Sequence, residues 1–388
     1  MSVGVETRKG PAYPAARKVA ATVEERFARR AATARAAGKE GLAPEPDAAV
    51  VEAVIDAAFW ASLRREEGYP PKISLAYLSP EQAAPSLTFA RPLPLAPTSL
   101  ARLAPAVERP GIHLGVWRCG ENGELCVWGT TRAIPRLCFV LEVVEPGLLV
   151  VKYRRGRDPG KFANVVVLHG DEVKVVDEGG GALPDCPGMV TSLLGFGAPS
   201  SNAEQVDVLV QLAVSMRAHG RGGTLLVVPT GSDAWRDSIL WPATYSVEPA
   251  FPELKEMLAR AEAESDDPEW QDALRRAVDA VAGMTAVDGA AVVSDRSELL
   301  AFGAKIVQSR SGEEVERVVV TEPVEGSAPE VVDPAELGGT RHLSAAQFVQ
   351  DQRDAVALVA SQDGRFTVFA WSPCEGMVHA HRVETLLL

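Results

Sequence analysis

The chain has 388 residues, of which 46% are hydrophobic and 23% are charged, and its formal net charge is −13. These proportions are ordinary for a globular protein and exclude disorder as the main state. The acidic balance argues against a general nucleic-acid binder, because such proteins neutralise phosphates with a basic patch. At about 100 to 200 residues per domain, the length predicts two or three domains.

Neither a membrane span nor a secretion signal is expected. No apolar run reaches the roughly 18 residues of a spanning helix, and the N-terminus lacks the apolar segment of a signal peptide. The cysteines are odd in number and include no CxxC pair, which favours buried thiols in a reducing compartment over a disulfide framework or a zinc site. We therefore expect a cytoplasmic protein without a membrane partner. The cysteines are Cys119, Cys126, Cys138, Cys186 and Cys374.

Two helices are predicted near the N-terminus. Residues 16–38 are rich in Ala, Arg and Glu and end at Gly38, which is a C-cap signal. Residues 48–65 carry apolar side chains at helical spacing. The basic surplus of the first helix could contact an acidic partner or nucleic acid, but a solvated helical face explains it more simply. Residues 80–110 contain seven prolines and predict a long irregular connector.

Strand patterns dominate residues 112–177, and their turns favour a mainly antiparallel sheet. A helix at residues 203–219 and a buried strand, TLLVVP, follow. The segment 252–284 is helical and acidic, with the break ESDDP in its middle. This break predicts a domain boundary near residue 265.

The sequence thus predicts three parts, which are a basic helical extension at residues 1–45, a middle domain at 46–264 and a C-terminal domain at 265–388. In the last part, two predicted hairpins flank a helix that follows GGTRH, and Asp363-Gly364 marks the turn of the second hairpin. The expected fold class is α/β. It combines a C-terminal mixed β-sheet flanked by helices with an N-terminal α/β region containing a mainly antiparallel sheet.

Three segments resemble familiar ligand-binding motifs but do not match them. GRDPGKF, at residues 156–162, is one residue short of a P-loop and has Phe162 where Ser or Thr would hold magnesium. GFGAPS, at residues 195–200, lacks the third glycine of a dinucleotide fingerprint. His379 and His381 would point to the same strand face, but without a third ligand they are more typical of the surface than of a metal site.

Two glycine-containing motifs remain. Asp288-Gly289-Ala290 stands where a helix gives way to a strand, and Gly338-Gly339-Thr340-Arg341-His342 precedes a helix that begins near Ser344. Glycines let a backbone approach a ligand, the first N–H groups of a helix point at an anion, and an Arg fork can bind two phosphate oxygens. The pattern favours a phosphate site. A capped helix start with a surface Arg and His is the alternative.

These motifs resemble the catalytic domain of the diadenylate cyclases, which condense two ATP into cyclic di-AMP and two pyrophosphates. The resemblance covers about residues 280–382 and includes a later turn, Ser361-Gln362-Asp363. It implies that Asp288 helps to hold a divalent metal, Mn²⁺ or Mg²⁺, and to activate the 3′-hydroxyl. It also implies catalytic roles for Arg341 and His342.

The same resemblance implies which residues bind the nucleotide and the metal. The metal ligands are expected to be Asp288 and Asp363. The nucleotide-binding residues are expected to be Gly289, Ala290, Gly339, Thr340, Arg341, His342 and Ser361. Because each ATP is both nucleophile and electrophile, two sites must face each other, so the resemblance further implies a homodimer or a higher assembly.

The chain departs from the family pattern at two positions. Leu343 stands where the family usually has a further Arg, which removes one phosphate contact. Gln362 stands where the family usually has a metal-binding Glu, so the metal site depends on Asp363. These departures leave three interpretations open. They are a cyclase of reduced or metal-restricted activity, a catalytically silent receptor for ATP or a cyclic dinucleotide, and a scaffold with vestigial motifs.

The N-terminal two thirds has a resemblance of its own. Trp128-Gly129 within a strand-rich unit, followed by a helix ending in HGRGGTLLVVP at residues 219–229, resembles the probable sensor domain called DACNV, which precedes some cyclase domains. It implies a sensor or regulatory role for residues 46–264. HGRGG could bind an anion through its backbone and Arg221, although glycines between a helix and a strand chiefly reverse the chain.

Overall fold

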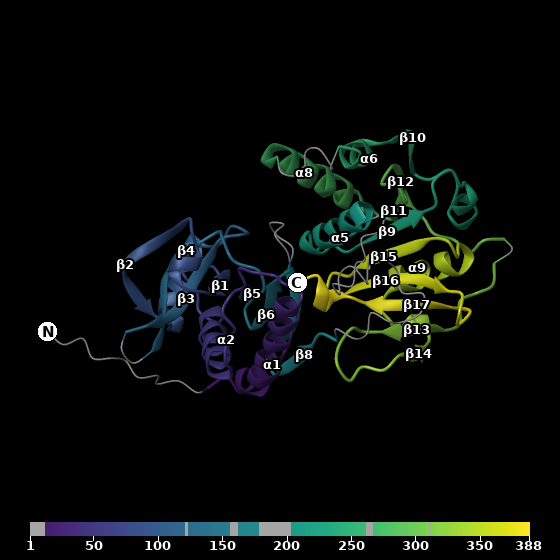
Figure 1. Cartoon of the computed structure of the whole chain (residues 1–388). Coiled ribbons are helices and arrows are strands. Elements are labelled where there is room, and N and C mark those ends of the chain that lie inside the picture. Colours follow the sequence, from purple (N-terminus) through teal and green to yellow (C-terminus); the bar gives the residue numbers. More distant parts are fainter. Residues whose placement is uncertain (1–11, 121–122, 156–161, 178–202, 261–266, 311) are drawn as a thin grey trace. The chain divides into compact units, whose positions relative to one another are not determined.

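The computed structural model divides the chain into two compact units, unit 1 at residues 1–176 and unit 2 at residues 177–388. Each unit is built on one mixed β-sheet flanked by helices, which confirms the predicted α/β class (Figure 1). The residues that the structure describes are 12–120, 123–155, 162–177, 203–260, 267–310 and 312–388. Cys186, GFGAPS and most of GRDPGKF lie outside them.

Unit 1 contains an eight-stranded sheet in the order β2-β4-β3-β1-β5-β6-β7-β8. Every neighbouring pair is antiparallel except β1 and β3, so the expectation of a mainly antiparallel sheet is confirmed. Its helices are α1 (Pro14–Ala36), α2 (Ala48–Ser62) and α3 (Pro97–Leu103), with 3₁₀ turns η1 (Pro80–Gln82) and η2 (Ala104–Ala106). Its strands are β1 (Ile73–Tyr77), β2 (Ser86–Pro94), β3 (His113–Cys119), β4 (Glu124–Thr131), β5 (Phe139–Glu145), β6 (Leu148–Arg154), β7 (Phe162–His169) and β8 (Glu172–Val175).

One face of this sheet is covered by α1 and α2. Apolar residues of the two helices, such as Phe27 and Ile55, share a core with the alternate strand residues Leu75, Leu141 and Val151. Alternation places these strand residues on one face because successive side chains in a strand point to opposite sides. The predicted basic helix at residues 16–38 is therefore not a separate extension, since α1 is part of the core of unit 1.

The opposite face of the sheet holds a buried polar cluster. Ser74 Oγ lies 2.7 Å from His113 Nδ1, and the Lys152 ammonium forms an ion pair with Glu142. Burial lowers the pKa of His113 to about 4, with Lys152 and Arg154 adding to the effect and Glu142 opposing it. His113 is therefore neutral in the folded protein at neutral pH.

We expect His113 to make unit 1 sensitive to acid. The unfolded chain protonates this histidine near pH 6.5 and the folded chain only near pH 4, so its stabilising contribution is complete above pH 6.5 and is lost as pH falls toward 4. Between pH 7 and 5 the loss is about 2 kcal/mol. Urea unfolding of wild type and His113→Gln at both pH values tests this. A pH dependence as steep in the variant as in wild type contradicts it.

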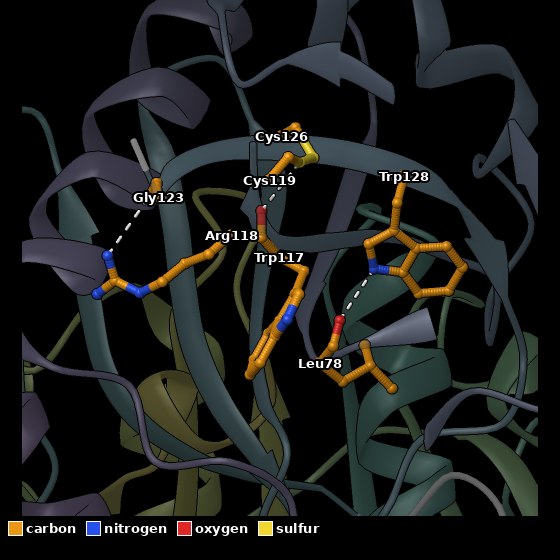
Figure 2. Close-up of a disulfide and its surroundings, with 7 residues drawn as sticks. All are labelled: Leu78, Trp117, Arg118, Cys119, Gly123, Cys126 and Trp128. Carbon is orange, nitrogen blue, oxygen red and sulfur yellow. Dashed lines mark hydrogen bonds between the residues drawn. A yellow bond between two sulfur atoms is a disulfide. The ribbon is translucent and has the colours of Figure 1, made fainter. Parts of the chain in front are cut away.

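A disulfide joins Cys119 and Cys126 across the β3–β4 hairpin (Figure 2). Their Cα atoms are 6.0 Å apart, within the range that a disulfide spans. The expectation that these two cysteines are unpaired thiols is therefore wrong, because spacing along the chain does not reveal that the pairing of β3 with β4 brings them together. Cys138 is a buried thiol as expected, and burial raises its pKa to about 12, whereas Cys374 is exposed.

Unit 2 contains a nine-stranded sheet in the order β10-β12-β11-β9-β15-β16-β17-β13-β14. Its helices are α5 (Ala203–Ala218), α6 (Glu253–Leu258), α8 (Pro268–Met284) and α9 (Thr340–Asp351), with 3₁₀ turns η4 (Ala234–Ser238), η5 (Pro334–Glu336) and η6 (Glu384–Leu386). Its strands are β9 (Gly223–Val228), β10 (Tyr245–Phe251), β11 (Ala290–Ser294), β12 (Leu299–Ala304), β13 (Val318–Thr321), β14 (Glu330–Val332), β15 (Val356–Ala360), β16 (Phe366–Ser372) and β17 (Met377–Arg382).

The core of unit 2 lies between α9 and the sheet. Phe348 of α9 packs with Leu226 of β9, Val292 of β11 and Phe369 of β16. Helices α5 and α8 contact each other, and they also contact β15 and β12 respectively. Parallel pairing of β9 with β11 and of β13 with β17, among otherwise antiparallel neighbours, makes this the mixed sheet that the sequence predicts.

The observed division of the chain differs from the boundary expected near residue 265. Strands β9 and β10 precede that position, yet β9 pairs with β11 and β15, and β10 pairs with β12. Sequence-local signals mark the acidic break but carry no information about such pairings. The strand TLLVVP is therefore a central strand of the C-terminal sheet.

His379 and His381 also differ from expectation, because both lie buried in β17. His381 Nδ1 lies 2.7 Å from the hydroxyl of Thr321, and His379 Nε2 lies 3.1 Å from a carboxylate oxygen of Glu375. Burial lowers the pKa of His381 to about 4. The two rings are thus polar members of the sheet interior, and the prediction of a surface pair is wrong.

Candidate functional site

The predicted motifs lie together along one edge of the unit 2 sheet, the edge formed by the ends of its strands and not by an outermost strand. Ala290, at the start of β11, is level with Thr224 in β9 and with Ala304 at the end of β12. Gly223, in turn, is level with Ala360 at the end of β15. The segments that lead into β9 and β11 and those that leave β12 and β15 therefore meet at the same edge.

The loop before β9 touches the motif at the start of α9. Gly222 has φ +70°, and a Cβ there would lie 2.9 Å from Nη1 of Arg341 and 3.2 Å from the carbonyl oxygen of Ala360. Gln362 donates a hydrogen bond from Nε2 to the carbonyl oxygen of Arg221 at 3.3 Å. The segment HGRGG therefore belongs to this edge, together with Arg341 and the turn after β15.

We expect Gly222→Ala to displace the Arg341 side chain. A methyl group at this position overlaps the end of the guanidinium, which is flexible and moves more easily than the backbone of Ala360. If Arg341 binds phosphate, the affinity for ATP should fall about tenfold, as for the loss of one charge-assisted bond. Isothermal titration calorimetry measures this.

Gly220→Ala is the matched control. Gly220 also has a positive φ, +64°, but a Cβ there meets no atom within 4 Å. Both variants carry similar backbone strain, so equal losses of ATP affinity in the two would show that strain, and not the position of Arg341, sets the effect.

Asp288 lies at the solvent-exposed end of this edge. Its side chain is 94% exposed, and its Oδ2 forms an ion pair at 2.6 Å with the ammonium of Lys305, which follows β12. The hydrogen bond and charge of Lys305, together with the charge of Arg341, hold the pKa of Asp288 below its ordinary value. The carboxylate is therefore ionised at neutral pH and accessible from solvent.

Gly289 and Ala290 have structural reasons for their identity. Gly289 has φ +120°, and a Cβ there would lie 2.4 Å from the carbonyl carbon of Gly303. Only a residue without a side chain permits this approach of β11 and β12. Ala290 is 2% exposed and belongs to the core beneath the edge.

The residues of GTRH divide into an exposed and a buried set. Gly339 is the N-cap of α9 and has open space around its Cβ position, while Thr340 and Arg341 are exposed. His342 is 3% exposed, with Nε2 3.4 Å from the hydroxyl of Thr367. The His342 side chain thus anchors the start of α9 to β16, and burial lowers its pKa so that it is neutral at neutral pH.

The turn after β15 is a closed hairpin. Ser361 donates its N–H to the carbonyl oxygen of Arg365 at 2.9 Å, and Gly364 donates to Ser361 at 3.2 Å. Asp363 Oδ2 forms an ion pair with Nε of Arg365 at 3.1 Å. The carboxylate of Asp363 is therefore already engaged by a cation of its own turn.

Basic side chains dominate the electrostatics of this edge. Four basic side chains, Lys305, Arg341, Arg365 and Arg382, lie close enough to act on Asp288 or His342, against the two carboxylates of Asp288 and Asp363. This local surplus stands out in a chain with a net charge of −13. Together with the N-terminus of α9, it forms a site suited to a polyanion.

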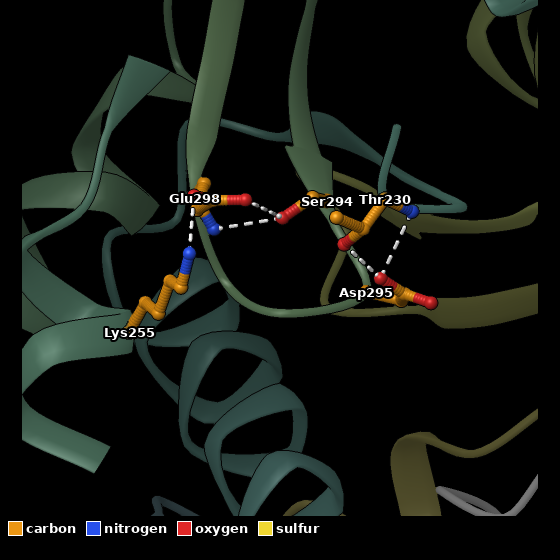
Figure 3. Close-up of polar contacts among 5 residues, drawn as sticks. All are labelled: Thr230, Lys255, Ser294, Asp295 and Glu298. Carbon is orange, nitrogen blue, oxygen red and sulfur yellow. Dashed lines mark hydrogen bonds and ion pairs between the residues drawn. The ribbon is translucent and has the colours of Figure 1, made fainter. Parts of the chain in front are cut away.

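The opposite edge of the sheet is stabilised by contacts among its own residues (Figure 3). Thr230 donates its backbone N–H to Asp295 at 3.0 Å, and Lys255 Nζ lies 2.8 Å from Glu298. Glu298 also accepts a hydrogen bond from Ser294 at 3.2 Å. The first pair connects the loop after β9 to the β11–β12 turn, and the second connects α6 to the same turn. The predicted motifs all lie at the other end of the strands.

Lys305 and Arg221 were not predicted as members of the site from the DGA and GTRH motifs. Lys305 lies beyond the strand LLAFGA, and nothing in its sequence neighbourhood places it beside Asp288. Arg221 lies in the HGRGG segment, which the sequence marks as able to bind an anion. The predicted boundary near residue 265, however, places that segment in the middle domain. Sheet pairing is the information that brings both to this edge.

Two solved structures are similar to parts of the chain. A hypothetical membrane spanning protein from Bacillus cereus is 15% identical, over 49% of this chain and 67% of its own, with a TM-score of 0.27. A double mutant of DacA from Staphylococcus aureus is 12% identical, over 46% of this chain and 86% of its own, with a TM-score of 0.24. No curated protein matches the chain.

Among the described residues, no helix has both the length and the apolar character needed to cross a bilayer. Residues 40–132 match the model of a family described as "Probable sensor domain DACNV". The match begins before α2, ends just after β4, and includes the Cys119–Cys126 disulfide. Within unit 1, residues 40–132 are therefore similar to this family of probable sensor domains.

Proposed function

We propose that unit 2 is a diadenylate cyclase, which condenses two ATP into cyclic di-AMP and two pyrophosphates, and that unit 1 regulates it. The observation that supports this most is the convergence of Asp288, Arg341 and the turn at Ser361 on one cationic sheet edge. These residues come from segments far apart in the sequence. They are the residues that the cyclase resemblance assigns to the site.

The proposed reaction is an in-line displacement at the α-phosphorus of one ATP. A bond forms from the 3′-oxygen of the other ATP to this phosphorus, and the bond from the phosphorus to the pyrophosphate oxygen breaks. The same displacement in the reverse sense, from the 3′-oxygen of the first ATP to the α-phosphorus of the second, closes the ring and releases the second pyrophosphate. Arg341 and the N-terminus of α9 hold the phosphates, and Lys305 lies close enough to Asp288 to share that work. Asp288, ionised and exposed, accepts the proton of the 3′-hydroxyl.

The residues present fit a divalent metal only in part. Asp288 offers an exposed carboxylate, and Mg²⁺ commonly takes one or two carboxylates together with substrate phosphates. Asp363 is paired with Arg365, and no cluster of three or more His, Cys, Asp or Glu side chains suited to a metal occurs among the described residues. When bound with ATP, Mn²⁺ or Mg²⁺ would neutralise charge developing on the phosphates.

A homodimer, or a higher assembly of such pairs, follows from the chemistry. Each ATP supplies a 3′-hydroxyl to the other, so two sites must face each other. Asp288 and Arg341 are both exposed at the sheet edge, which leaves them accessible to a nucleotide held by a second copy. We propose a twofold pair as the catalytic unit.

A catalytically silent receptor for ATP or a cyclic dinucleotide is the second candidate. It is favoured by the two engaged carboxylates and by Gln362, whose amide donates to Arg221 and which has no charge to offer a metal. Such a receptor needs only the cationic surface of the site. It would bind nucleotide and release no pyrophosphate.

Incubation of the purified chain with ATP and either Mn²⁺ or Mg²⁺, followed by mass spectrometry, separates the two candidates. Cyclic di-AMP and pyrophosphate in a ratio of one to two support the cyclase. Nucleotide binding without either product supports the receptor. The absence of both binding and product, with no ATP-induced rise in melting temperature, removes both candidates and favours a scaffold.

A further inference from the structure

An aromatic pair with one exposed ring lies beside the Asp288 loop. Tyr245 begins β10 and is paired in register with Phe302 of β12. Their rings are stacked, with centroids 4.7 Å apart and an interplanar angle of 16°. Tyr245 nevertheless remains 48% exposed, so much of a large aromatic side chain faces solvent at this edge of the sheet.

The Tyr245 ring is separated from the Asp288 loop by one glycine. Gly303 has φ +63°, and a Cβ there would lie 2.9 Å from Cδ2 of Tyr245 and 3.6 Å from the carbonyl oxygen of Asp288. The missing side chain of Gly303 lets the ring lie against the backbone. Tyr245 is thus part of the same local surface as Asp288 and Lys305.

The strand order arranges these groups in a row. Counted inward from the outermost strand, the order is β10, β12, β11 and β9. Tyr245 begins β10, Lys305 follows the end of β12, Asp288 precedes β11, and the loop before β9 contacts Arg341. Neighbouring strands are about 4.8 Å apart, so the backbones of β10 and β11 are separated by roughly 10 Å along the edge. The row runs from an aromatic face through a carboxylate to cations.

We propose that Tyr245 provides the face on which the adenine of a bound ATP stacks, an inference that rests on the proposed function. An ATP laid along the row places its phosphates at Arg341, its ribose near Asp288 and its base at Tyr245. A phenol ring and a purine stack favourably, and this interaction tolerates any base because every base has a π-face. Tyr245 therefore strengthens ATP and GTP binding alike and does not select between them.

Calorimetric titration of the full chain with ATP, and separately with inorganic tripolyphosphate, tests this role. Tyr245→Ala should lower the affinity for ATP about tenfold or more and leave the affinity for tripolyphosphate unchanged. Tyr245→Phe keeps the ring and should bind ATP as wild type does. Phe251→Ala removes a 44% exposed aromatic from the far end of the same strand and should change neither affinity.

The outcomes distinguish this inference from the proposed function. Wild-type affinity for ATP in Tyr245→Ala overturns the stacking role and leaves the proposed function intact. Equal losses for ATP and tripolyphosphate in Tyr245→Ala also overturn it, because they indicate a disturbed phosphate site. If the wild-type chain binds neither probe, the proposed function itself fails.

Discussion

Asp288→Asn should abolish the formation of cyclic di-AMP while ATP binding persists. The substitution removes a charge and a proton acceptor but keeps the size of the side chain, which is 94% exposed and supports no packing. Loss of a group that accepts a proton in the reaction lowers rates by about a hundredfold or more. Product is measured by mass spectrometry and ATP affinity by calorimetry.

Asp295→Asn is the control for this substitution. Asp295 is also an exposed aspartate of unit 2, but it lies at the opposite edge of the sheet, where it accepts from Thr230. We expect wild-type product from this variant. If Asp288→Asn forms product at the wild-type rate, the role proposed for Asp288 is contradicted. The same result would still establish that the chain is a cyclase.

Gly289→Ala should destabilise unit 2 strongly. The added methyl group meets the carbonyl carbon of Gly303 at 2.4 Å, where neither backbone can move without breaking the pairing of β11 and β12. The φ of +120° adds strain for any residue with a side chain. Together these effects cost about 2 to 5 kcal/mol, or roughly 5 to 15 °C in melting temperature.

Gly283→Ala should act in the opposite direction. Gly283 lies in α8, is exposed, and has no atom within 4 Å of its Cβ position. Alanine there favours the helix by about 0.5 to 1 kcal/mol. Thermal unfolding of both variants tests the pair, and a Gly289→Ala protein that melts at the wild-type temperature would show that the close approach of the two strands is not fixed.

Much of the secondary structure could be predicted because local patterns determine it. The hydrophobic run of β9 and the paired runs of β15 and β16 were recognisable from alternation and turn residues. The stretch at residues 80–110 was not, since its prolines predict irregular chain. It contains β2 and α3, and β2 tolerates Pro92 and Pro94 because it is an edge strand of its sheet.

The candidate site was predictable only in its motif residues. Asp288 and Arg341 were found from glycine-containing motifs, and the structure places both at one edge. The cyclase resemblance implies that His342 binds nucleotide, yet its ring is buried against β16. Lys305, Arg221 and Tyr245 reach the edge only through strand pairing, which depends on contacts between distant parts of the chain.

The central position of β9 determines where the chain can be divided. A fragment that begins at residue 265 lacks β9, and its β11 and β15 would each expose a row of unpaired N–H and C=O groups. Exposed edges of this kind recruit other chains, so such a fragment should aggregate. A fragment that begins at residue 177 retains all nine strands of the sheet. It is therefore the fragment, shorter than the whole chain, from which to attempt crystals of the proposed enzyme.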